Sequence, residues 1–250
     1  MSSTSVPTPG TIAPLSEPQR IINTFIAPSK TFADVKRVGR WWAPWLLISI
    51  FSYALVGVVA QKIGFDQVTE NQLKLSPKRA EQLEKSPPED RARRMQFSVT
   101  ITKTISLLIP LVNVIYFAFI AAVLLATMKF GAGAEITFAT ALAVTTYSYL
   151  PSIVHVLLAI ASVFAGADPE GFNFQNPVAS NLGHLVSPAS SPAVYALLSK
   201  IDIFSIWICV LLAIGFASVS KLKRSTTMAI VFGWYVLVTL LSVGFAAAFS

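Results

Sequence analysis

The chain has 250 residues, of which 54% are hydrophobic and only 12% are charged. Because soluble globular domains carry about 25% charged residues, this composition excludes an ordinary soluble domain and indicates a membrane protein. The net charge of +7 does not indicate a nucleic-acid partner, since the Lys and Arg residues gather beside apolar segments, where they suit lipid headgroups.

The first 18 residues, MSSTSVPTPGTIAPLSEP, are rich in Ser, Thr and Pro. They contain no basic stretch followed by an apolar core, so they do not form a signal peptide pattern. The composition predicts a disordered N-terminal lead over residues 1–18, followed by one membrane domain over residues 19–249.

Residues 19–40 predict two short amphipathic helices separated at Pro28, with their basic side chains turned toward headgroups at the membrane interface. Trp41, Trp42 and Trp45 follow directly and are typical of the aromatic belt at a membrane boundary. Two interpretations stay open for this segment: an ordinary cytoplasmic flank, or an element that docks partners.

Five apolar segments approach the roughly 20 residues that a helix needs to cross the hydrocarbon core. They are too long and too continuous for the alternating strands of a membrane barrel, and helices satisfy their own backbone groups in lipid. The predicted fold is therefore an all-α bundle of five transmembrane helices with an interfacial N-terminal segment. The spans cover approximately residues 42–61, 104–128, 136–165, 201–219 and 226–249.

Two hydrophilic loops separate the spans. Residues 62–103 carry nine Lys or Arg and six Asp or Glu and have helical character interrupted at Pro87–Pro88, whereas residues 166–199 carry no Lys or Arg. Because the second loop has no Lys or Arg, it suits the translocated side, which places the N-terminus in the cytoplasm and the C-terminus outside. The basic first loop falls on the outer side in this arrangement, which conflicts with the charge rule.

Ser199 and Asp202 stand where the fourth span begins. The spacing Ser-x-x-acid predicts that Ser199 caps the helix and that Asp202 reaches back to the free backbone donors near the positive end of the helix dipole. The functional alternative makes Asp202 an ion or partner site at the membrane edge, because acids in a membrane are costly.

Pro151 interrupts the third span. It has no backbone N–H to donate to the carbonyl of Tyr147, so a kink and an open carbonyl are expected there. His155 lies one turn further along the helix. Two interpretations stay open: a packed, hydrogen-bonded kink, or a proton or solute site.

Pro110 and Asn113 lie three residues apart in the second span. Asn113 is expected to hydrogen-bond a neighbouring helix. Small residues four positions apart favour close helix approach and are compatible with a homo-oligomer. They are Ala118, Ala122 and Ala126 in the second span and Ala213 and Ala217 in the fourth.

Catalytic motifs are absent from the sequence. It contains no His-Glu-x-x-His helix, no Gly-x-Ser-x-Gly elbow and no phosphate-binding GxxxxGK[ST] loop, and its two histidines cannot form a three-His zinc site. The single cysteine, Cys209, lies in an apolar run and is expected to be a small buried hydrophobe. We therefore expect no enzyme activity and no metal or other cofactor.

The chain resembles the bacterial branch of the YIP1 family over about residues 18–249. Four stretches carry the resemblance: IAPSKTFADVKRVGRWWAPWLL, TFATALAVTTYSYLPSIVHVLLAI, NFQNPVASNLGHLV and LLSKIDIFSIWICVLLAIGFASVSKLKRSTTMAI. The resemblance implies five membrane spans and a cytoplasmic N-terminus. Eukaryotic relatives look like partners of Rab-type GTPases, but their Asp-Leu-Tyr-Gly-Pro motif is replaced here by IAPSKTF, so the trafficking role is not carried over.

These observations lead to two hypotheses of different kinds. The first is a non-enzymatic protein of the bacterial inner membrane that organises or recruits unknown protein partners through residues 19–40 and 62–103, with the lipid bilayer as its surroundings. The second is a small-solute transporter or channel built around Pro110 and Asn113 together with Pro151 and His155. The second hypothesis predicts a polar cavity at mid-membrane depth, open to one side.

Overall fold

The computed structural model describes residues 13–75, 77–174, 176–187 and 191–249. Helices make up the ordered structure of these residues, and the described part contains no strand, only an isolated bridge between Asn181 and Asp202. Five helical segments in it are long and apolar enough to cross a membrane, which confirms the predicted all-α fold with five spans. They are Trp42–Lys62, Ile109–Ala132, Phe138–Phe164, Ile203–Ser220 and Arg224–Ala248.

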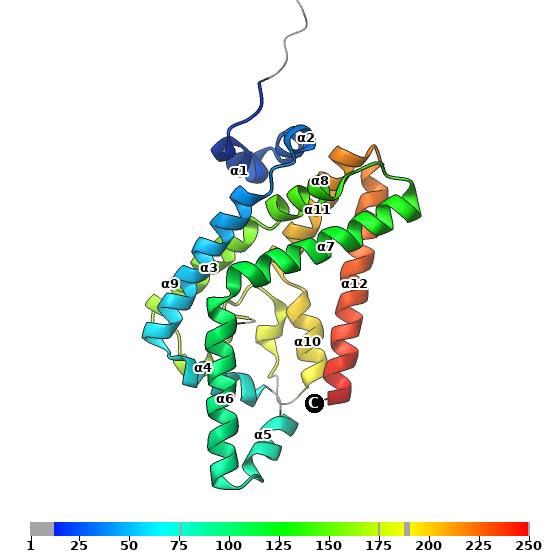
Figure 1. Ribbon diagram of the computed structural model, residues 1–250. Helices are drawn as coiled ribbons and strands as arrows, with labels where there is room; N and C mark the ends of the chain where they lie inside the picture. The colour runs from blue at the N-terminus through cyan, green and yellow to red at the C-terminus, as the bar shows by residue number, and fades with distance from the viewer. Residues whose placement is uncertain (1–12, 76, 175, 188–190, 250) are drawn as a thin grey trace, which may run out of the picture.

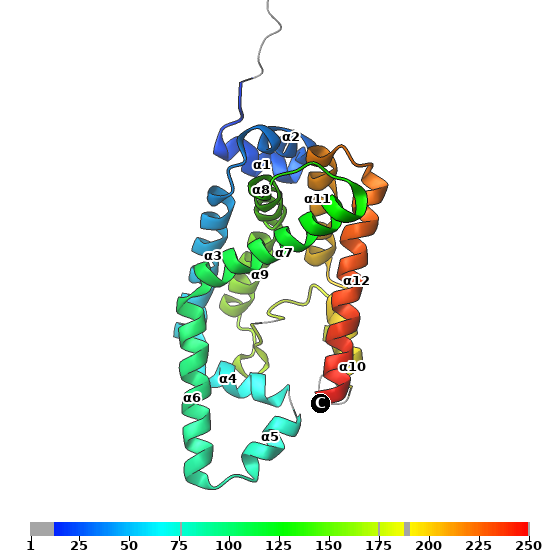
Figure 2. The same cartoon turned by 45° about the vertical axis from the view of Figure 1, so that its right-hand side comes forward.

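The N-terminal segment forms two helices that cover one end of the molecule. They are α1 (Glu17–Ile26) and α2 (Pro28–Val38). Helix α1 includes the last two residues of the predicted lead, Glu17 and Pro18, because Ser16 and Gln19 form a reciprocal capping box. Residues 1–12 of that lead lie outside the described residues. Figures 1 and 2 show both helices lying across the end of the bundle, above α8 and α11.

The first span, α3 (Trp42–Lys62), leads to the opposite end of the molecule. The hydrophilic connection there is largely helical, as predicted, and Pro88 opens its last helix after the expected interruption. Its helices are α4 (Phe65–Lys74), α5 (Pro77–Glu84) and α6 (Pro88–Leu107).

Helices α6 and α7 (Ile109–Ala132) meet at a sharp bend at Leu108 (Figures 1 and 2). Pro110 causes the break because it has no N–H to continue the helix. Side chains of α3 stabilise the bend: Tyr53 donates its hydroxyl to the carbonyl of Leu107 (2.7 Å), and Trp45 donates its indole N–H to that of Pro110 (2.9 Å). The second span therefore begins at Ile109, five residues after the predicted start.

Helices α8 (Phe138–Ser148) and α9 (Pro151–Phe164) form the third span, with the expected break at Pro151. Every residue from Ala141 to Ser148 is buried, so α8 is the centre of the bundle. The main core gathers around it from α2, α3, α7, α11 and α12.

The last part of the chain returns to the hairpin end and back. After two short 3₁₀ turns come α10 (Pro192–Lys200), α11 (Ile203–Ser220) and α12 (Arg224–Phe249). Cys209 is buried on α11, as expected. The last described residues of α12 lie at the end opposite α1 and α2, as an odd number of spans requires (Figure 1). Its outer surface exposes a series of large apolar side chains, Val236, Leu237, Val238, Leu240, Leu241 and Phe245.

Candidate functional site

A buried ion cluster joins the two N-terminal helices. Arg20 on α1 donates from Nε to Oδ2 of Asp34 on α2 (2.6 Å) and from Nη1 to Oε1 of Glu17 (2.6 Å). Arg20 is 2% exposed and Asp34 is 6% exposed. A charge this deeply buried persists only when it is paired, so the pair fixes α1 and α2 as one unit, which we call the hairpin.

The cluster also joins the hairpin to the membrane bundle. Tyr147, fully buried on α8, donates its hydroxyl to Oε2 of Glu17 (2.6 Å). Glu17 therefore accepts from the hairpin through one oxygen and from the bundle through the other. The carbonyl of Tyr147, expected to be open, accepts from the N–H of Leu150 (3.1 Å). Tyr147 therefore makes its long-range contact, with Glu17, through its side chain and not through its backbone carbonyl.

Backbone groups complete the cluster. Thr24 and Thr31 both donate their hydroxyls to the carbonyl of Arg20 (2.8 and 2.9 Å), and the N–H of Leu15 donates to Oδ1 of Asp34 (3.2 Å). Burial disfavours the charged form of Arg20, but the hydrogen bond to Asp34 and the neighbouring carboxylates outweigh it and raise the pKa of Arg20. The cluster is a hydrogen-bonded network that joins α1 and α2 to each other and to α8.

Apolar contacts support the same attachment. Phe32 and Val35 on α2 are buried in the main core. Gly215 on α11 makes room for the ring of Phe32, because a Cβ at this glycine would lie 2.6 Å from Val144 Cγ1 and 3.0 Å from Phe32 Cε1. The hairpin therefore packs against the bundle, a contact that the sequence does not predict.

Asp202 organises the junction between α10 and α11. It is the N-cap of α11: Oδ1 accepts from the N–H of Ser205 (2.8 Å), and Oδ2 accepts from the hydroxyl of Ser180 (2.5 Å). The N–H of Ile203 donates to the carbonyl of Ser180 (3.2 Å). Asp202 therefore ties the loop that precedes α10 to the start of α11.

The predicted cap at Ser199 is wrong. Ser199 lies in the last turn of α10, and its buried hydroxyl has no hydrogen-bond partner in the part of the chain that the structure describes. The sequence pattern misplaced the helix start because α10 and α11 are separate helices, broken at Ile201. An acid directly before Ile203 can cap the helix on its own.

Around Asp202 the loop is held by amides and a histidine. Asn176 and Asn181 exchange hydrogen bonds through their side chains, and Asn176 also contacts the hydroxyl of Tyr195 (3.2 Å). His184 Nε2 lies 3.1 Å from Asn176 Oδ1 and 2.8 Å from the carbonyl of Val178. These contacts give the loop a defined shape.

The transporter hypothesis depends on His155 and Asn113. The ring of His155 lies against that of Phe204 (centroids 5.0 Å apart), and its buried Nε2 has no hydrogen-bond partner among the described residues. Asn113 is half-buried, and in the same part of the chain its side chain makes no hydrogen bond, so the expected interhelical bond is not found. Neither residue lines the two cavities described below.

Sequence reasoning singled out Tyr147 and Asp202 but missed Glu17, Arg20 and Asp34. A signal was present: Asp34 is an acid among four basic residues between positions 30 and 40, and Glu17 follows a capping serine. The described residues contain no group of three or more His, Cys, Asp or Glu side chains placed to hold a metal ion.

Comparison with known proteins gives one match. The family model of the Yip1 domain matches residues 22–247, which is nearly the whole membrane domain; Glu17 and Arg20 lie just before it. No curated protein and no solved structure matches the chain. With a match of this extent over five membrane-spanning helices, the chain belongs to the Yip1 domain family.

Proposed function

We propose that this protein is a non-enzymatic organiser of the bacterial inner membrane that recruits protein partners through its N-terminal hairpin. The observation that carries the proposal is the rigid attachment of the hairpin through Glu17, Arg20, Asp34 and Tyr147. Burying charges to hold a surface helix pair in one position costs free energy. A protein that recognises its partners through a fixed surface would benefit from this attachment.

The outer face of α2 is the proposed recognition surface. Lys30, Ala33 and Lys36 are exposed on it, while Phe32 and Val35 face the core. A basic face beside the membrane attracts acidic protein segments as well as anionic headgroups. Residues 62–103 provide a second exposed surface at the other end.

The charge of the two ends supports a cytoplasmic hairpin. The hairpin end, with the turns after α7 and α11, carries nine Lys or Arg and three Asp or Glu, a net charge of +6. The rest of the chain carries ten Lys or Arg and nine Asp or Glu, a net charge of +1. The rule for membrane orientation counts Lys and Arg in short loops rather than net charge, so the loop of residues 166–199, which has no Lys or Arg, is the feature that favours the hairpin end inside.

Transport of a small solute is the alternative function. It requires a polar cavity near Pro110, Asn113, Pro151 and His155. The smaller of the two cavities described below reaches their neighbours Ile109 and Val156, but its wall is mainly apolar. Transport also predicts flux in proteoliposomes that falls when His155 is replaced by Phe. Recruitment predicts no such flux.

Site-specific photocrosslinking tests the recruitment proposal. A photoreactive amino acid at Ala33 is expected to capture a defined protein in living cells, and capture should fall severalfold in the Lys30→Glu/Lys36→Glu background. Leu241, an exposed lipid-facing residue of α12, is the control position. Capture of the same proteins from both positions, or of lipid alone from Ala33, would contradict the proposal.

A further inference from the structure

Two adjoining cavities lie at the end of the bundle opposite the hairpin. The larger, about 520 Å³, lies between α4, α5 and α6. The smaller, about 380 Å³, lies between α3, α6, α9 and Phe174 of the following loop. Both are lined by Gln72, Ile101 and Thr102, so they form one continuous crevice along α6. Each is within the range of about 300–1,000 Å³ that is typical of small-molecule sites.

The chemistry of this crevice changes along its length. The smaller cavity is lined mainly by apolar side chains from spans α3 and α9 and from the α6–α7 bend, and it contains no charged residue. These side chains are Leu55, Val56, Ile105, Ile109, Val156 and Phe174. The larger cavity has amide and hydroxyl groups on its walls and a single charged side chain, Arg94.

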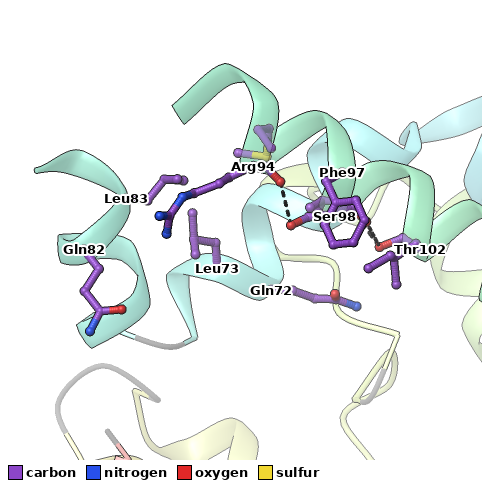
Figure 3. Close-up of a pocket in the computed structure, with 11 residues that line it drawn as sticks. Gln72, Leu73, Gln82, Leu83, Arg94, Phe97, Ser98 and Thr102 are labelled. Carbon is purple, nitrogen blue, oxygen red and sulfur yellow. Dashed lines mark hydrogen bonds between the residues drawn. The ribbon is translucent and has the colours of Figure 1, made fainter. Parts of the chain in front are cut away.

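Arg94 points from α6 into the space between α4, α5 and α6 (Figure 3). Its guanidinium makes no ion pair within the part of the chain that the structure describes. The nearby hydroxyls of Ser98 and Thr102 donate to carbonyls one turn earlier, as the dashed lines in Figure 3 show. Their oxygens remain able to accept, but Arg94 is the cationic donor of the crevice, and it suits a phosphate in particular.

We propose that this crevice binds one anionic phospholipid, with its phosphate at Arg94 and an acyl chain along Ile101 into the smaller cavity. The polar end of the crevice lies among the hydrophilic helices, and the apolar end lies beside two membrane spans, in the same order as the parts of a lipid. Phe97, Ile101 and Ile105 are exposed along one face of α6 and give the acyl chain an apolar path from the bilayer.

The lining favours a lipid over a peptide helix. The lining of the crevice includes one cation and no acid, which complements one negative headgroup. The apolar cavity is bounded by spans that a bilayer surrounds, where acyl chains are the abundant apolar ligand. The proposal is independent of recruitment through the hairpin, because it concerns the other end of the molecule.

Native mass spectrometry of the detergent-purified full-length chain, titrated with phosphatidylglycerol or phosphatidylcholine, tests the proposal. We expect one phosphatidylglycerol bound per chain in preference to phosphatidylcholine. Arg94→Gln should weaken its binding about tenfold, as expected for losing a hydrogen-bonded charge contact, while Arg91→Gln on the same exposed helix leaves it unchanged.

A second pair of variants tests the acyl-chain end. Ile105→Trp fills the smaller cavity and should reduce binding of both lipids, whereas Ile115→Trp, at an exposed position of α7 outside the crevice, should not. Equal binding of the two lipids by the wild-type chain, equal effects of Arg94→Gln and Arg91→Gln, or equal effects of the two Trp variants would each overturn the proposal.

Discussion

Asp34 and Arg20 illustrate how a single pair of side chains attaches a helix hairpin to a membrane bundle. Both are buried, and each is the other's charged partner at 2.6 Å. We expect Asp34→Asn to destabilise the protein by about 3 kcal/mol, because it removes one of the two carboxylates that pair with the buried Arg20. The free energy of unfolding in mixed micelles measures this loss.

An exposed ion pair and an apolar replacement serve as controls for Asp34. Glu81→Gln removes the partner of Lys85 on the surface of α5 and should change stability by less than about 1 kcal/mol. The double variant Arg20→Met/Asp34→Leu should be more stable than Asp34→Asn, because it removes both charges together. A loss for Asp34→Asn no greater than that for Glu81→Gln would contradict the role of the cluster.

Asp202 makes a second prediction at the scale of the residue. Asp202→Ala removes both the cap of α11 and the acceptor for Ser180, so we expect a loss of about 1–2 kcal/mol in unfolding free energy. Ser199→Ala removes a hydroxyl without a described partner and should have almost no effect. Equal losses of unfolding free energy in the two variants would instead support the capping box of Ser199 and Asp202 that the sequence pattern predicts.

Gly215 determines how closely α11 approaches α2 and α8. A methyl group there meets Val144 and Phe32, so we expect Gly215→Ala to destabilise the protein by about 1–3 kcal/mol through overpacking. Gly233 on α12 has open space around its Cα, and Gly233→Ala should be neutral or slightly stabilising. Thermal unfolding of the two variants in detergent measures the difference, and similar melting temperatures would refute the close contact.

At the scale of the element, apolar length and proline position predict the spans well. The runs near residues 42–61 and 201–219 become α3 and α11 within a few residues, and Pro151 breaks the third span as expected. These are local properties of the chain, governed by hydrocarbon thickness and by the missing proline N–H.

The candidate site is formed by contacts between residues that lie far apart in the sequence, so a local sequence pattern does not predict them. Tyr147 reaches Glu17 across 130 positions, and Trp45 reaches the carbonyl of Pro110 across 65. Likewise, the alanine stripe on α7 does not mark its buried face: Ala122 and Ala126 are exposed, while Ala121 and Leu124 are buried. Which face of a membrane helix meets its neighbours depends on the whole arrangement, since lipid-facing and buried faces are both apolar.

The whole molecule has two ends of different character. The hairpin end is compact and carries the buried ion cluster and most of the net positive charge, whereas the other end spreads into α4, α5 and the first half of α6 (Figure 2). Each end would meet a different aqueous phase, so the two proposed binding regions act on opposite sides of the membrane.

Cysteine labelling tests this division. In a Cys209→Ser background, we introduce single cysteines at Lys36 and Lys223 of the hairpin end and at Lys85 and Glu170 of the other end, all exposed. A maleimide that cannot cross the membrane should label the second pair in cells with a permeable outer envelope. It should label the first pair only after the inner membrane is opened, because the proposed orientation places the hairpin in the cytoplasm. The reverse pattern would overturn the orientation but keep the five spans, whereas labelling of Lys36 and Glu170 from the same side would contradict the spans themselves.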